Sequence, residues 1–216
     1  MDKQLYCIRH GESQFNEWRT RSLLTFSWIF TRDPMILDPR LSAKGEQQVT
    51  ELHERIQAER LHEKIQATSP DELETDDAYV SVVDPMCREM MDTSSDIGRD
   101  ASELEAAFHA LRLDLTGLEP HWWVPEGLRT DPSFIKTPTK YDEVVRLRET
   151  KDQLDERIRE FIAHLAKLPY EHIAIVGHSY FFKRMLGMNR KLANCELAVV
   201  SLNELATRHN VSLDKE

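Results

Sequence analysis

Two short apolar runs predict buried parallel strands. Residues 4–9 and residues 172–176 are nearly continuously apolar, which is typical of strands that are covered on both faces. Ligands bind at the carboxyl ends of such strands, and we expect these two ends to lie side by side. Further strands are predicted over residues 64–70, 79–83 and 197–202, with the last one at an edge of the sheet.

Apolar residues at helical spacing predict the helices. One helix begins after Ser42, which is a good N-cap residue, and the four predicted helices cover residues 43–61, 104–115, 140–165 and 180–188. The polar residues 207–216 are expected to fray. A chain of 216 residues is long enough for one sizeable core. We therefore predict a single α/β domain over residues 1–216 with a doubly wound sheet.

Residues 11–40 separate the first strand from the first predicted helix and are expected to be an irregular connection. This segment mixes aromatic residues with arginines, and long connections in compact domains are often functional. We favour a flap that packs on the domain surface. The alternative is a lid whose arginines reach a substrate. The aromatic residues concerned are Trp18, Phe26, Trp28 and Phe30.

The net charge of −10 narrows the class of partner. A nucleic-acid binder or a membrane-surface protein would need a basic face, so neither function is expected. Positive charge is nevertheless concentrated locally in the first forty residues, at Arg9, Arg19, Arg21, Arg32 and Arg40. The three cysteines have no metal-like spacing, and no signal peptide precedes the first strand. These features predict reduced thiols and a cytoplasmic protein.

The residues most suited to catalysis follow the ends of the two predicted strands, 4–9 and 172–176. The first strand leads into Arg9-His10-Gly11-Glu12-Ser13, and the second leads into Gly177-His178-Ser179. A guanidinium at a strand end can clamp phosphate with two hydrogen bonds. An imidazole there can act as a nucleophile or a general base. Gly11 permits a sharp turn and a close approach of the backbone to a ligand.

These motifs resemble those of the histidine phosphatase superfamily, which includes the cofactor-dependent phosphoglycerate mutases. The resemblance depends on Arg9 to Ser13 with Asn16, on Leu41-Ser42 with Gly45, and on Gly177-His178. It implies a three-layer α/β sandwich in which helices cover both faces of a mostly parallel, doubly wound sheet.

The resemblance also implies a mechanism. His10 would attack phosphorus, and Glu89 would protonate the leaving oxygen. Arg9 and His178 would neutralise charge on the equatorial oxygens, and Asn16 would add a neutral hydrogen-bond donor. The expected partner is a small phosphorylated substrate. No cofactor and no metal are expected, and the sequence has no signature of an oligomeric state.

The middle of the chain departs from the family pattern. After Ser69-Pro70 the family has a helix that carries a second phosphate-binding arginine, whereas residues 71–77 here contain five acids and no arginine. In one alignment, Arg88 replaces this arginine and binds the substrate. In the other, which we favour, Arg88-Glu89 matches the segment that supplies the acid, and Glu89 is the proton donor. Glu126 is a weaker alternative for the acid.

Three functions follow from this comparison. The first is a phosphomonoesterase that acts through a phosphohistidine intermediate. The second is a catalytically impaired member that binds phosphorylated ligands or a protein partner, which the missing arginine suggests. A phosphoglycerate mutase is the least favoured, because the chain is short for that branch and its middle motifs match poorly.

Overall fold

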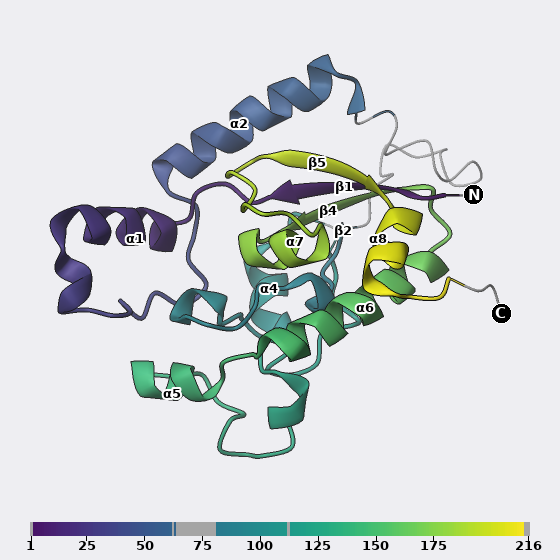
Figure 1. Ribbon diagram of the computed structural model, residues 1–216. Helices are drawn as coiled ribbons and strands as arrows, with labels where there is room; N and C mark the ends of the chain where they lie inside the picture. The colour runs from purple at the N-terminus through teal and green to yellow at the C-terminus, as the bar shows by residue number, and fades with distance from the viewer. Residues whose placement is uncertain (1, 62, 64–80, 112, 214–216) are drawn as a thin grey trace.

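The computed structural model is an α/β fold built around a mixed sheet (Figure 1). It describes residues 2–61, 63, 81–111 and 113–213. The main sheet has the strand order β4-β1-β5, made of β4 (His172–Gly177), β1 (Gln4–Arg9) and β5 (Leu197–Ser201). The predicted strand over residues 64–70 and the acidic segment 71–77 lie outside the described residues.

The strand β1 is the centre of this sheet. It pairs in parallel with β4, from Gln4 opposite His172 to Arg9 opposite Gly177. This register confirms that the two strand ends lie side by side. On its other edge β1 pairs with β5, and these two strands run antiparallel. A second sheet of two parallel strands joins β2 (Ser81–Val82) to β3 (Leu113–Asp114).

Three helices pack against one face of the main sheet and enclose the principal core. They are α6 (Lys151–Lys167), α7 (Ser179–Met185) and α8 (Leu202–His209). Helix α2 (Ala43–Ala58) lies on the opposite side of the sheet in Figure 1. The α6 stripe is buried as predicted, and with β1 and α7 it contributes Leu5, Cys7, Leu154, Ile158, Phe161, Ile162, Leu165, Phe181 and Phe182 to the core.

Several predicted helix boundaries are wrong. The predicted helix 140–165 is two helices, α5 (Tyr141–Arg146) and α6, because Thr150 caps α6 and Glu149 turns inward. The predicted helix 104–115 is shortened to α4 (Ala101–Ala107), because β3 pairs with β2. Residues 207–216 were predicted to fray, but residues 207–209 form the last turn of α8 (Leu202–His209). The remaining short helices are η1 (Ser27–Ile29), η2 (Pro85–Cys87), η3 (Ser94–Asp96) and η4 (Glu126–Leu128).

The connection over residues 11–40 is not irregular, because it contains helix α1 (Gln14–Thr25). Ser13 caps this helix: its Oγ accepts a hydrogen bond from the Asn16 backbone, and the Asn16 side chain accepts one from the Ser13 backbone. The favoured flap holds only for the later part of the segment, where Asp33 is buried and accepts two hydrogen bonds from Ser94. Leu24 is 77% exposed and Phe30 is 90% exposed, so the end of α1 and the turn after it do not pack on the domain.

No helix in the described part of the chain is long and apolar enough to cross a membrane.

Candidate active site

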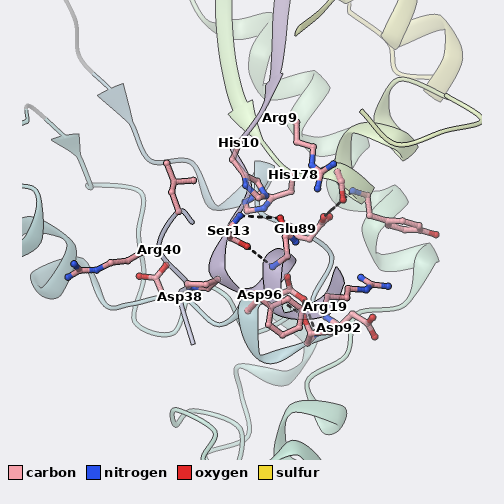
Figure 2. A pocket seen from close by; sticks show the side chains of 18 of the residues that line it. Arg9, His10, Ser13, Arg19, Asp38, Arg40, Glu89, Asp92, Asp96 and His178 are labelled. Carbon is pink, nitrogen blue, oxygen red and sulfur yellow. Dashed lines mark hydrogen bonds between the residues drawn. The ribbon is translucent and has the colours of Figure 1, made fainter. Parts of the chain in front are cut away.

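A cavity of about 990 Å³ opens where β1 and β4 end. Figure 2 shows Arg9, His10, His178 and Glu89 gathered in one part of it. Asn16 also lines the cavity, so the structure brings together five of the six residues selected from the sequence. The exception is Arg88.

His10 is held in one tautomer by its own loop. Its Nδ1 lies 2.6 Å from the Gly11 carbonyl oxygen. Because a carbonyl oxygen only accepts hydrogen bonds, Nδ1 carries the proton, and Nε2 of the neutral ring keeps its lone pair. The His10 and His178 rings make an edge contact, with 5.1 Å between their centroids and 61° between their planes. The backbone N–H of His10 donates to the Gly177 carbonyl, which continues the pairing of β1 with β4.

Two glycines let this loop lie against the start of α2. A Cβ on Gly11 would stand 2.8 Å from the Gly45 carbonyl oxygen, and one on Gly45 would stand 2.0 Å from the Glu12 carbonyl oxygen. The sequence suggested that Gly11 lets a ligand approach the backbone. In the structure, the start of α2 is what approaches Gly11. The Glu12 carboxylate then accepts hydrogen bonds from Ser42 and Lys44, which fixes the loop that carries His10.

Burial sets the charge of the two histidines. It lowers the pKa of His10 below its usual value, and the nearby Arg9 guanidinium adds to the effect, although the hydrogen bond to Gly11 opposes it. Burial also lowers the pKa of His178, to about 4, against the opposing effect of the Glu89 carboxylate. Both imidazoles are therefore neutral at pH 7.

Arg9 reaches the cavity with donors to spare. Its Nη1 donates to the Leu192 carbonyl oxygen at 2.7 Å. Its Nε is buried and has no hydrogen-bond partner in the part of the chain that the structure describes. Arg9 lines the cavity, and a guanidinium in that position is suited to bind an oxyanion.

Glu89 is fixed by four hydrogen bonds, three of which come from the start of α7. Its Oε1 accepts from the backbone of Phe181 at 2.8 Å and of Met90 at 3.0 Å. Its Oε2 accepts from the Tyr180 backbone at 3.0 Å and from Ser179 Oγ at 3.4 Å. The carboxyl group is thereby held next to His178, the residue before this helix. Glu126, the weaker alternative for the acid, is exposed in η4 and does not line the cavity.

Asn16 has a structural task besides the one predicted. Its Oδ1 accepts the backbone N–H of Ser13 at 3.4 Å. The amide nitrogen of the side chain is the group left to serve as the predicted donor in the cavity.

Arg88 does not line the cavity, and the alignment that gave it a phosphate-binding role is not supported by its position. Its guanidinium makes two hydrogen bonds of 3.1 Å with the Glu149 carboxylate. Arg157 contacts the same carboxylate at 2.7 Å and also donates to the carbonyl oxygens of Met86 and Arg88. The three side chains tie the segment before Glu89 to α6.

Replacing Glu149 with alanine is expected to lower the free energy of unfolding by about 3–5 kcal/mol, because it leaves two arginines near one another without their shared carboxylate. Glu149 is 4% exposed and Arg88 is 8% exposed, so water does not compensate for the loss. Urea denaturation at pH 7 measures the change. The exposed pair Glu156–Arg159 is the control, since Glu156→Ala should cost less than about 1 kcal/mol. Equal effects of the two substitutions would contradict the structural role.

Three more residues that line the cavity are Asp96 and Lys191, for which the sequence predicted no role in the site, and Arg19, one of the arginines of the predicted lid alternative. Burial raises the pKa of Asp96 to about 7, and the charge of Glu89 adds to this. The Asp96 carboxylate accepts from the backbone of Asp92 and Thr93. The Thr93–Asp96 spacing is a capping-box signal, so the sequence indicated a turn here and not a place in the site.

Comparison with known proteins gave structural neighbours only. No family model and no curated protein matches the sequence. Among solved structures, the α-ribazole phosphatase from Shigella flexneri is 17% identical, with a TM-score of 0.42 and coverage of 91% of this chain and 89% of that one. Phosphoserine phosphatase from Entamoeba histolytica, in complex with 3-phosphoglyceric acid, is 16% identical, with the same TM-score and coverage.

A mycobacterial glucosyl-3-phosphoglycerate phosphatase is 14% identical, with a TM-score of 0.41 and coverage of 93% of this chain and 91% of that one. These three neighbours are members of the superfamily that the sequence motifs resemble. Because identity is low and each TM-score is below 0.5, the function proposed for this chain depends on the geometry of its cavity.

Proposed function

We propose that this protein is a phosphomonoesterase that acts on a small phosphorylated substrate through a phosphohistidine intermediate. One observation carries the proposal: a neutral His10 whose Nε2 keeps its lone pair lies beside His178, in a cavity that Arg9 and Glu89 also line. This is a nucleophile with a cationic clamp and a carboxyl group for proton transfer.

The reaction proceeds in two displacements. In the first, Nε2 of His10 forms a bond to phosphorus as the bond to the ester oxygen breaks, and Glu89 transfers a proton to that oxygen, which leaves as an alcohol. In the second, Glu89 removes a proton from water, the water oxygen attacks phosphorus, and inorganic phosphate departs from His10. Arg9 and His178 stabilise the charge on the equatorial oxygens in both steps.

Four further properties of the protein are part of the same proposal. They are a single domain over residues 1–216, a doubly wound three-layer layout, a cytoplasmic location, and chemistry that needs no cofactor or metal. Free thiols fit a reducing compartment: Cys7, Cys87 and Cys195 are unpaired, and burial raises the pKa of Cys7 and of Cys87 to about 12.

A screen of phosphorylated metabolites against the wild type and His10→Ala tests the function. Release of inorganic phosphate by the wild type, together with a ³²P-labelled protein adduct trapped by rapid denaturation in alkaline detergent, would support it. Binding of phosphorylated ligands with neither turnover nor an adduct would instead support the impaired, ligand-binding alternative. Interconversion of 2- and 3-phosphoglycerate would identify a mutase.

His178→Ala is expected to lower kcat/KM by about 10²–10³, because it removes one donor from a clamp that still contains Arg9. The substitution should not prevent formation of the adduct, since His10 remains. Single-turnover kinetics with a labelled ester measures the rate of adduct formation. Substitution of His172, which lies at the opposite end of β4 and outside the cavity, is the control. An undiminished rate for His178→Ala would remove His178 from the mechanism.

A further inference from the structure

We propose that Lys191 supplies a second cation that binds the phosphoryl group beside Arg9, an assignment that deepens the proposed function and depends on it. Lys191 lies in the connection between α7 and β5, and it lines the cavity together with His10, His178 and Glu89.

A second cation is needed in this part of the cavity to balance the charge of a bound phosphate. A phosphate monoester carries a charge of about −1.5 to −2 at neutral pH. The two histidines are neutral there because burial lowers both of their pKa values. Arg9 contributes one positive charge, so even with Glu89 protonated for its role as the acid these four residues alone would present a single positive charge to a dianion. Residues 61–87 contain no arginine, and Arg88 is bound to Glu149.

Besides Arg9, four cationic side chains line the cavity: Arg19, Arg40, Arg99 and Lys191. Their positions show which of them can reach a phosphoryl group beside Arg9. Arg99 pairs with Asp38 and lies over the Phe108 ring. Arg40 extends away from the two histidines in Figure 2. Arg19 and Lys191 remain, and Lys191 is the one fixed against the site itself. Its Nζ lies 5.6 Å from the centre of the Tyr180 ring, and the backbone of Tyr180 donates to Glu89.

The Lys191 ammonium has N–H donors available for an anion. Within the described residues it makes no hydrogen bond or ion pair, and the Tyr180 ring is its one specific contact. Burial lowers its pKa, and the Glu89 carboxylate opposes this, whereas Arg19 and Arg9 add to it. A partly desolvated ammonium between two other cations gains more from an incoming dianion than an exposed lysine does.

The loop around Lys191 is tied to the end of β1. Leu192, the next residue, accepts the Arg9 side chain through its carbonyl oxygen. Asn194 donates its side-chain amide to the His10 carbonyl at 3.0 Å, and the Cys195 backbone donates to the Arg9 carbonyl at 3.0 Å. On the other side, Arg190 pairs with Glu196 through two hydrogen bonds. These hydrogen bonds therefore fix the position of the Lys191 backbone relative to Arg9.

The test compares Lys191→Met with Lys191→Arg and with the control Lys183→Met. Lys183 is a lysine of α7 that does not line the cavity, although its charge helps to lower the pKa of Lys191. Its replacement therefore removes an equal charge close by but no donor that lines the cavity. The probe is inorganic phosphate, whose affinity is measured by isothermal titration calorimetry, and kcat/KM is measured on the best ester from the screen. Circular dichroism checks that each variant is folded.

Lys191→Met is expected to weaken phosphate binding and to lower kcat/KM by about 10- to 100-fold, which is the usual worth of a hydrogen bond to a charged group. Lys191→Arg should stay within about threefold of the wild type, since a guanidinium keeps the charge and the donors. Equal phosphate affinity of Lys191→Met and Lys183→Met would overturn the inference. Phosphate binding that depends on Lys191, in a protein that forms no phosphohistidine, would uphold this site and overturn only the proposed reaction.

Discussion

His10→Ala is expected to abolish turnover and the trapped adduct together. The substitution removes the only group in the proposal that bonds to phosphorus, and no neighbouring donor can replace it. The measurement is kcat/KM for ester hydrolysis, paired with ³²P trapping. His53→Ala, on the exposed part of α2, is the matched histidine control and should leave both readouts unchanged.

The kcat/KM of the wild type should also depend on pH, and the direction of the change follows from the pKa of His10. Attack requires the neutral imidazole, and burial lowers the pKa of His10 below its ordinary value of 6.5. The acid limb of kcat/KM in the wild type should therefore fall below pH 6.5, with activity lost as the pH decreases. Near wild-type hydrolysis by His10→Ala would show that the phosphohistidine mechanism is wrong for this protein.

Glu89→Gln is expected to lower kcat/KM by about 10²–10⁴ for an alkyl phosphate, the usual worth of a positioned acid–base group. Glutamine cannot supply a proton to the leaving alkoxide. The loss should be much smaller for p-nitrophenyl phosphate, whose leaving group departs without protonation. Comparison of the two esters separates proton transfer from a general disturbance of the start of α7, because a disturbance would lower both rates alike.

Asp96→Asn is the matched variant for this prediction. Asp96 is another carboxyl group that lines the cavity, and burial raises its pKa to about 7. We expect its replacement to have the smaller effect on the alkyl phosphate, because Glu89 is held next to His178. A nearly silent Glu89→Gln beside a severely impaired Asp96→Asn would reassign the acid to Asp96.

The sequence predicted β1 and β4 correctly, although the middle of β1 is buried whereas Val176 of β4 is 64% exposed. The strands β1 and β4 are short apolar runs, so both their existence and the histidines that follow them were readable. Helix α1 was missed because it buries only Phe15 and Ser22 and has no apolar stripe. The capping signal of Ser13 with Asn16 was available for it, but Asn16 was interpreted as a ligand alone.

Side-chain partners distant in sequence account for the remaining errors at the site. Arg88 looked available for phosphate because its partner Glu149 is 61 residues away, beyond any local pattern. Lys191 had no motif around it, and its place in the cavity depends on contacts of its loop with Arg9 and His10, more than 180 residues earlier. Such long-range pairing is a property of the folded chain and leaves no periodicity to read.

The hydrogen bond between His10 Nδ1 and the Gly11 carbonyl also decides the regiochemistry of the intermediate. With Nδ1 engaged at 2.6 Å, only the nitrogen remote from the main chain is open to phosphorus. The covalent species would be the tele isomer of phosphohistidine and not the pros isomer. Once phosphoryl transfer leaves the ring positively charged, the same carbonyl oxygen remains in contact with the N–H that shares that charge. The short loop between β1 and α1 would thus choose the isomer and also stabilise it.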